Sequence, residues 1–309
     1  FELYYAISGI GAVCHTINPR LFPEQITYIA NHAEDTALFF DLTFLPLVEK
    51  LAPSLKSIRT YGLMTGREHM PAASALPGLL CYEGLLAEMS PEFVWPEFDE
   101  NAACALCYTS GTTGEPKGVL YSNRSMMLHT FSLIATRPDL FAHNRKILPV
   151  VPLFHANAWS LPYITPLTGC KFILPGAKLD GATLFDLMES EDVDAGWGVP
   201  TVWLGLIEEF KKRGRKPKNL RQILSGGSAV PQAMIDTLTR DYDIEVTHGW
   251  GMTEMSPVGT LTVFRPEERA KPPLERAALS ARQGRRMFGV DLKVIDEKGD
   301  RAPADGQTS

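Results

Sequence analysis

Short apolar runs alternate with longer amphipathic segments along most of the chain. The short runs are rich in β-branched and aromatic residues and are bounded by turn residues, which is the pattern of buried strands. On this pattern we expect strands over residues 36–41, 103–109, 146–152, 171–175, 195–199, 222–227 and 244–250.

The longer segments carry apolar residues at a spacing near 3.6 and have the boundary residues of helices. Pro23 suits a first helical turn, Ser122 is placed to cap a helix, and Gly214 follows a Lys-Lys-Arg ending. The alternation of strands and helices predicts an α/β fold with a mostly parallel sheet flanked by helices. The helices expected in this way span 23–31, 123–135, 200–214 and 230–242.

The last part of the chain follows a different pattern. Residues 265–286 are charged and interrupted by prolines, which indicates a solvated excursion of helix and loop. Residues 289–306 alternate apolar and polar side chains around Gly299, which indicates a hairpin and a small β subdomain.

Composition excludes several classes of protein. The chain has 309 residues, 45% of them hydrophobic and 21% charged, so it can bury a sizeable core. The net charge of −6 argues against a nucleic-acid partner, and no run of 18 apolar residues could cross a membrane. An odd number of scattered cysteines favours free thiols in a reducing compartment, so we expect a cytoplasmic protein. The cysteines are Cys14, Cys81, Cys104, Cys107 and Cys170.

Cys104 and Cys107 have the spacing of a redox motif or of half a zinc site. They lie in the strand expected over 103–109, where residues three apart point to opposite faces. With no second cysteine pair in the chain, we interpret both as structural.

One loop is too rich in small polar residues to be explained by packing. Its glycines are costly to order, but its backbone N–H groups and hydroxyls can converge on phosphate oxygens, and a lysine adds positive charge. A surface hairpin is the alternative interpretation. The loop consists of Thr109, Ser110, Gly111, Thr112, Thr113 and Gly114, followed by Lys117.

The loop does not match two familiar phosphate-binding patterns. In the Walker A register that starts at Gly111, Pro116 and Gly118 stand where glycine and a hydroxyl residue are required, and Pro116 has no N–H. The dinucleotide fingerprint fails as well, because the segments 9–14 and 249–254 lack its third glycine.

The loop resembles the signature of the adenylate-forming (AMP-binding) superfamily, which includes acyl-CoA synthetases, luciferases and adenylation domains. Two further segments, 11–21 and 121–130, are similar to bacterial fatty-acyl-CoA synthetases (medium- and long-chain fatty-acid–CoA ligases). The resemblance covers essentially the whole chain and implies an acyl-CoA synthetase-like large N-terminal domain. Its four ordered motifs are YTSGTTGEPKGV (108–119), VPLFHANAW (151–159), LSGGSAV (224–230) and HGWGMTEMSP (248–257).

The resemblance implies a reaction in which a carboxylate attacks the α-phosphate of ATP, and a thiol, coenzyme A, then displaces AMP. Catalysis would consist mainly of positioning and charge neutralisation. By resemblance the loop would wrap the β- and γ-phosphates with Lys117, Thr253 would offer a hydroxyl to the α-phosphate, and Glu254 would bind Mg²⁺.

The same resemblance implies an adenine slot and an acid site. His155 would lie beside the acyl carboxylate, and Trp159 is a candidate for the mouth of the acyl tunnel, with a plain core role as its alternative. Trp250 offers a stacking face, and the main chain around His248 and Gly249 would read the amino edge of the base. The implied slot residues are Gly226, Gly227, Ser228, His248, Gly249, Trp250 and Gly251, with Gly227 also near the acid.

The residues between the histidine and the next strand indicate which kind of acid is activated. Residues 156–179 contain no Asp or Glu to pair with the ammonium group of an amino acid. The apolar and aromatic character of this stretch favours a fatty acid, while an aryl or a short- to medium-chain acid stays open.

Two family features are missing from the sequence. The Tyr/Trp-x-Thr-Gly-Asp motif that holds the ribose is absent, and so is the C-terminal domain with its adenylation lysine. We therefore expect a partial N-terminal domain over 1–309, truncated at both ends and weakly active or inactive alone. A P-loop phosphotransferase and a non-catalytic ATP-binding relic are the competing functions, and the resemblance is compatible with a homodimer.

Overall fold

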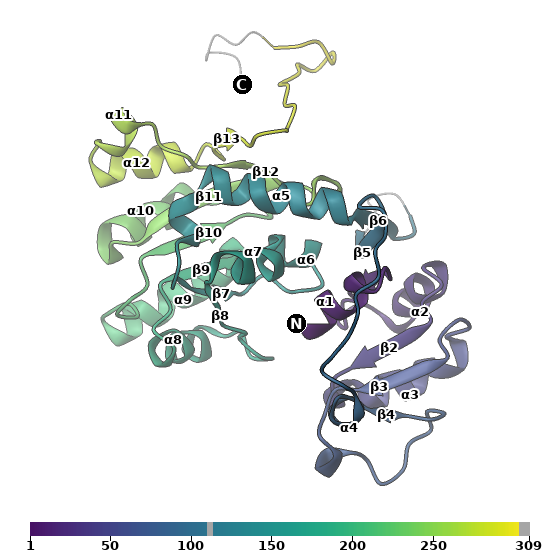
Figure 1. The fold of residues 1–309 in the computed structure, drawn as a ribbon. Helices are drawn as coiled ribbons and strands as arrows, with labels where there is room; N and C mark the ends of the chain where they lie inside the picture. The colour runs from purple at the N-terminus through teal and green to yellow at the C-terminus, as the bar shows by residue number, and fades with distance from the viewer. Residues whose placement is uncertain (110–113, 303–309) are drawn as a thin grey trace. The chain divides into compact units, whose positions relative to one another are not determined.

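The computed structural model describes residues 1–109 and 114–302. The chain forms two compact units, which are drawn in Figure 1. The first unit comprises Phe1–Ser125 and Leu153–Asn157, and the second comprises Met126–Pro152 and Ala158–Ser309.

The second unit is built on a sheet of seven strands within the described residues, in the order β13-β12-β11-β10-β9-β7-β8. The strands from β11 to β8 are parallel, and β12 and β13 extend the sheet in antiparallel fashion. The strands are β7 (Lys146–Pro149), β8 (Lys171–Phe172), β9 (Ala195–Gly198), β10 (Gln222–Ser225), β11 (Glu245–Gly251), β12 (Val258–Leu261) and β13 (Arg285–Arg286).

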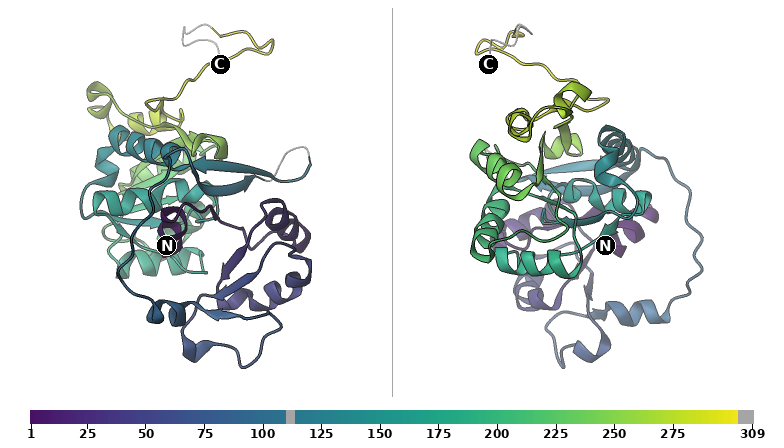
Figure 2. Two further views of the ribbon diagram at one scale, coloured as in Figure 1. Left: turned by 45° about the vertical axis from the view of Figure 1, so that its right-hand side comes forward. Right: turned by 90° about the vertical axis from the view of Figure 1, so that its left-hand side faces the viewer.

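Helices cover both faces of this sheet. The apolar faces of α8, α9 and α10 pack on β7, β10 and β11 in one hydrophobic core that includes Phe185, Trp203 and Ile235. Figure 2 shows α5 and α7 on the opposite face of the sheet from α9 and α10. The helices are α5 (Asn123–Thr136), α6 (Ala156–Trp159), α7 (Leu161–Thr168), α8 (Gly181–Ser190), α9 (Pro200–Arg213), α10 (Gln232–Tyr242), α11 (Pro266–Arg269) and α12 (Pro273–Ser280).

The first unit contains two smaller sheets. One is parallel, in the order β2-β3-β4, and packs with α2 and α3 around Phe40, Tyr61 and Leu63. The other has the order β1-β5-β6, with β1 parallel and β6 antiparallel to β5. The elements are α1 (Glu2–Gly9), β1 (Cys14–His15), α2 (Pro23–His32), β2 (Ala37–Phe40), α3 (Leu45–Leu51), β3 (Thr60–Leu63), β4 (Leu80–Cys81), α4 (Tyr82–Glu88), β5 (Ala103–Thr109) and β6 (Lys117–Ser122).

The predicted α/β class, the parallel sheets and the expected strands and helices are confirmed, with small changes at their ends. β7 stops three residues early because the N–H groups of Val150 and Val151 both bond to the carbonyl of Trp197, which breaks the ladder. Ser122 caps α5 as expected, since its Oγ accepts from the N–H of Ser125 at 3.0 Å.

The charged segment after β12 is less solvated than the sequence predicts. Although its other helix, α11, has no buried residue, α12 packs against α10 and buries Ala277 in the core of the second unit. The expected hairpin around Gly299 is present as an antiparallel bridge between Ile295 and Arg301. In the described part of the chain, no helix combines the length and apolar character of a membrane span.

All five cysteines are free thiols. Burial raises the pKa of Cys104 to about 11 and that of Cys14 to about 12. Because a thiol is reactive only as the thiolate, these two are chemically inert at neutral pH.

Candidate active site

The glycine- and threonine-rich loop joins the antiparallel strands β5 and β6 of the first unit. Thr109 ends β5, pairs with Lys117 at the start of β6, and its hydroxyl lies 3.5 Å from the carbonyl of Lys117. The side chain of Lys117 is exposed, and Gly114 has φ +149° with no atom of the described residues within 4 Å of where a Cβ would stand. The ladder therefore fixes both ends of the loop, while Ser110, Gly111, Thr112 and Thr113 lie outside the described residues.

Tyr108 immediately precedes the loop, and its side chain contacts residues of α2 and β1. Its hydroxyl is 2.6 Å from Nδ1 of His32, and its ring lies 5.2 Å from that of His15. His15 is in turn paired with Asp35 at 2.8 Å. These contacts hold the strand end from which the loop departs.

In the second unit, a glycine turn follows β10 at the carboxyl edge of the parallel strands. A Cβ on Gly226 would stand 2.8 Å from the carbonyl oxygen of Gly249 and 3.4 Å from the ring of Trp159. Gly227 has φ +78°, a conformation that favours glycine, and both Gly227 and Ser228 are exposed. Only glycines let the backbone run this close to β11.

One hydroxyl at this edge was not singled out by the sequence. Ser225, the last residue of β10, is fully buried, and its Oγ has no hydrogen-bond partner among the described residues. A buried polar atom without a partner is uncommon and marks a place that a ligand or water can complete. Ser225 lies in the motif LSGGSAV, but the sequence alone gives its hydroxyl no separate role.

The backbone N–H and carbonyl groups of His248 already form hydrogen bonds within the protein. Its N–H donates to Oγ1 of Thr262 at 3.1 Å, and its carbonyl accepts from the N–H of Thr262 at 2.9 Å. The imidazole is buried, which lowers its pKa. The polar backbone group that faces the glycine turn is therefore the carbonyl of Gly249.

β11 ends in an irregular turn that carries the remaining motif residues. The register shifts between Trp250 and Gly251, and the ring of Trp250 lies against Gly259 of β12. Thr253 and Glu254 follow in a short 3-10 helix (Thr253–Met255), in which Glu254 is exposed.

His155 and Trp159 belong to the connection between β7 and α7. The sequence places His155 directly after a buried strand, but β7 ends at Pro149, so a loop intervenes. The His155 side chain is accessible, although the protein packed around it lowers its pKa through desolvation. Trp159 is 5% exposed and lies against the glycine turn and 6.3 Å from the ring of Trp197.

The turn that carries Trp159 is left-handed. The residues from Ala156 to Ser160 have φ values between +45° and +67°. Each non-glycine residue in this conformation costs about 1–2 kcal/mol, so the surrounding structure has to hold the turn.

A buried histidine supplies part of that support. Nε2 of His129, on α5, accepts from the N–H of Val258 at 3.0 Å, so Nδ1 carries the proton and donates to Oγ of Ser160 at 2.8 Å. The Ser160 hydroxyl then donates to the carbonyl of Ser256 at 3.3 Å. Burial lowers the pKa of His129 to about 4, which keeps the imidazole neutral. This network is not among the features expected from the sequence, although a histidine among the apolar positions of a helix is a signal for it.

The structure thus gathers the predicted residues into two sets. Within the second unit, Trp159, Gly226, Gly227 and Gly249 are in contact, and Trp250 to Glu254 continue from the same strand. Thr109, Gly114, Lys117 and His155 belong to the first unit.

Comparison with known proteins gives the class of protein that this fold and these motifs define. The sequence matches the family described as AMP-binding enzyme over residues 1–308, so the chain belongs to this family.

Two relatives and one solved structure show what the chain is similar to. The chain is 47% identical to a medium-chain-fatty-acid–CoA ligase of Ectopseudomonas oleovorans and 46% identical to a 3-methylmercaptopropionyl-CoA ligase of Ruegeria lacuscaerulensis. Each comparison covers 99% of this chain and 56% or 57% of the relative. The fold is similar to that of an anthranilate CoA ligase solved with anthranoyl-AMP, with a TM-score of 0.79, 19% identity, and coverage of 97% of this chain and 54% of that one. The chain therefore spans about half the length of the proteins it resembles.

Proposed function

We propose that this protein activates a hydrophobic carboxylic acid with ATP, forming an acyl-adenylate that is then converted to a coenzyme A thioester. The observation that carries the proposal is the glycine turn at Gly226 and Gly227, which lies at the carboxyl edge of a parallel sheet in a chain of the AMP-binding family. Ligands of open α/β sheets bind at this edge.

The glycine turn suits a flat base. Gly226 leaves room beside the carbonyl of Gly249, which can accept a hydrogen bond from an exocyclic amino group. Trp250 offers an aromatic face, and Ser225 offers a buried hydroxyl without a partner among the described residues. These residues fit the adenosine part of ATP.

The triphosphate and its metal require charge neutralisation. We assign the phosphates to the loop that ends at Lys117, whose ammonium group is exposed, and the α-phosphate to the hydroxyl of Thr253. Among the described residues, no three His, Cys, Asp or Glu side chains gather into a metal site. Glu254 would therefore hold Mg²⁺ as a single carboxylate that works together with substrate phosphates, which is the usual arrangement for this ion.

The acid is assigned from the segment that follows His155. We assign its carboxylate to the side of His155, which is accessible and favours the neutral imidazole. The segment 156–179 offers no carboxylate to an amino group, and it buries Trp159, Leu161 and Ile164. The named substrates of the two curated relatives, a medium-chain fatty acid and a thioether acid, support a hydrophobic acid, with a fatty acid as our first choice.

The test is acid-dependent AMP formation by the product of the complete gene. We expect AMP release with octanoate, palmitate or 3-(methylthio)propionate, and thioester formation only when coenzyme A is added. Benzoate in the same panel tests the aryl alternative. Formation of ADP in place of AMP, or no acid-dependent turnover with any acid, would refute the proposal.

Two variants test the assigned charges. Lys117→Ala and Glu254→Gln should each lower kcat/KM for ATP by at least about 100-fold, because charge stabilisation of this kind contributes that much. The controls Lys56→Ala and Glu267→Gln remove exposed charges elsewhere and should behave as wild type. Unchanged kinetics in both test variants would contradict the assignments.

A further inference from the structure

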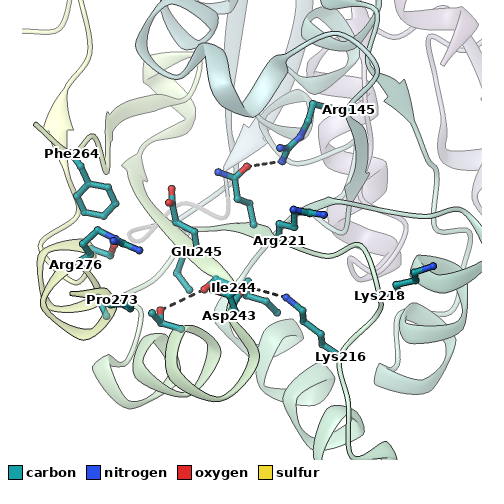
Figure 3. Close-up of a pocket in the computed structure, with 15 residues that line it drawn as sticks. Arg145, Lys216, Lys218, Arg221, Asp243, Ile244, Glu245, Phe264, Pro273 and Arg276 are labelled. Atoms are coloured by element: carbon teal, nitrogen blue, oxygen red, sulfur yellow. Dashed lines mark hydrogen bonds between the residues drawn. The ribbon is translucent and has the colours of Figure 1, made fainter. Parts of the chain in front are cut away.

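A cavity of about 500 Å³ opens at the end of the second unit's sheet opposite the glycine turn. It lies at the amino edge, where β10 begins at Gln222 and β11 begins at Glu245 (Figure 3). The glycine turn follows the other end of β10, so the two places are separated by the length of the strands. None of the residues assigned to ATP or to the acid lines this cavity.

The lining is predominantly cationic. Its carboxylates are those of Asp243 and Glu245, and Glu245 is already paired with Arg137 at 3.0 Å and with Arg269 at 3.3 Å. The cations are Arg145, Lys216, Lys218, Arg221 and Arg276.

Most of these cations are not neutralised by the protein. Arg145 is paired with Asp194 at 2.6 Å, but among the described residues Lys216 donates only to the backbone carbonyl of Asp243, at 3.0 Å. Within the described part of the chain, the side chains of Lys218 and Arg221 have no ion pair. The cavity therefore carries an excess of positive charge.

Lys216 is partly desolvated and lies close to Arg221. Burial lowers the pKa of Lys216, an effect that the carboxylate of Asp243 opposes and to which the guanidinium of Arg221 adds a smaller lowering. Cations held close together in a partly desolvated place repel each other, and an anion between them would relieve the repulsion.

The size and the donors of the cavity indicate a class of anion. Its volume falls in the range of small-molecule sites. A guanidinium beside an ammonium group is a combination suited to phosphate oxygens, since the first binds as a planar fork and the second as a point charge. Phe264 and Pro273 form an apolar side of the same cavity (Figure 3).

We propose that this cavity is a second anion site, in which Arg221 and Lys216 bind the phosphate group of a small molecule at the sheet edge opposite the glycine turn. The proposal is independent of the proposed function, because it needs neither the acid nor coenzyme A. The phosphate could come from the inorganic ion or from a nucleoside monophosphate, and Phe264 would contact only the latter.

The test is calorimetric titration of the complete gene product with inorganic phosphate and, separately, with GMP. Lys117→Ala serves as the background, because it removes the charge assigned to the triphosphate. In that background Arg221→Gln and Lys216→Gln should each weaken phosphate binding about tenfold or more, as expected when one charge-assisted contact is lost. Lys212→Gln, an exposed cation at the end of α9 outside the cavity, is the matched control and should change binding less than twofold.

Three results would overturn the proposal. The first is an unchanged affinity for phosphate in both cavity variants. The second is an equal loss of affinity in Lys212→Gln, which would indicate nonspecific attraction. The third is loss of all phosphate binding in the Lys117→Ala background. Thermal unfolding of each variant checks that it is folded, and Arg221 makes no ion pair within the described residues whose loss would destabilise the protein. Phe264→Ala identifies the source of the phosphate: weaker binding of GMP alone indicates a nucleoside monophosphate, and unchanged binding of both indicates that the phosphate group suffices.

Discussion

At Gly226 the absence of a side chain is what allows the loop after β10 to approach β11. The nearest backbone atom to a Cβ at this position, the carbonyl oxygen of Gly249, would be 2.8 Å away. Backbone cannot move as a flexible side chain can, so a methyl group here has to displace the turn. The geometry of the proposed adenine site therefore depends on this residue more than on any charged group.

We predict that Gly226→Ala destabilises the protein by about 1–3 kcal/mol and weakens ATP binding, because the turn must move away from Gly249. Thermal unfolding and nucleotide titration measure the two effects. Gly205→Ala is the matched control, because a Cβ at Gly205 of α9 has nothing within 4 Å and alanine favours a helix. Equal behaviour of the two variants would contradict this account of the turn.

His129 makes stability depend on pH. Its imidazole has a pKa of about 4 in the folded protein, against an ordinary value of 6.5. Between these values the unfolded chain binds the proton and the folded chain does not, so stability is full above pH 6.5 and falls as the pH approaches 4. Burial lowers the pKa values of His155 and His248 in the same direction.

We predict a loss of up to roughly 3 kcal/mol from His129 over this range, measured by denaturant unfolding at a series of pH values. His129→Gln should be less stable at pH 7, because it breaks the bonds to Ser160 and Val258, but its stability should depend less on pH. The exposed His143 gives the control variant His143→Gln, which should keep the wild-type slope. Parallel curves for wild type and His129→Gln would show that His129 is not the titrating group.

Between elements, Arg137 joins the end of α5 to β11 and to the backbone that follows β12. Its side chain is 3% exposed and donates to Oγ1 of Thr247, to the carbonyl of Thr262, and to the carboxylates of Asp139 and Glu245. Every one of these partners would lose a bond if the guanidinium were removed.

We predict that Arg137→Met lowers the free energy of unfolding by about 3–5 kcal/mol, the usual cost of breaking a buried ion pair. Arg265→Met is the control, because Arg265 is exposed and its charge lies 3.9 Å from that of Glu267. Urea denaturation measures the free energy of unfolding of both variants. A difference below about 1 kcal/mol between the two free energies would contradict the role given to Arg137.

The elements also show why some of the structure could be predicted and some could not. Strands such as β9 and β10 are short segments with an apolar centre followed by turn residues, and α9 has proline at its start and glycine at its end, so local sequence is sufficient for them. The left-handed turn from Ala156 to Ser160 could not be predicted, because its residues favour other conformations and tertiary contacts hold it. The packing of α12 was missed for a related reason, since one alanine, Ala277, makes its contact with the core.

The same distinction holds for the candidate site. The loop around Lys117, the glycine turn and the segment with Glu254 stand out because their composition makes little sense for packing. The roles of His129, Ser160 and Ser225 do not follow from the sequence, since only the folded chain defines the partners of the first two and the burial of the third. The sequence therefore indicates the groups that we propose to contact a ligand, and the structure adds the hydrogen bonds of His129 that support the turn carrying Trp159.

At the scale of the whole molecule, the proposed adenine site and the proposed anion site lie at the two ends of the same parallel strands in the second unit. The carboxyl edge offers glycines, a carbonyl and an aromatic face, while the amino edge offers cations. A nucleotide carries a base that suits the carboxyl edge and phosphates that suit the amino edge. The place where it binds therefore distinguishes the two proposed sites.

The central claim is tested most directly by a crystal structure of the protein with ATP and Mg²⁺. The account predicts the base beside Gly226 and Gly249, the metal at Glu254 and the terminal phosphates near Lys117. Density for ATP only in the cavity around Arg221, or only at other places away from the glycine turn and Glu254, would contradict it.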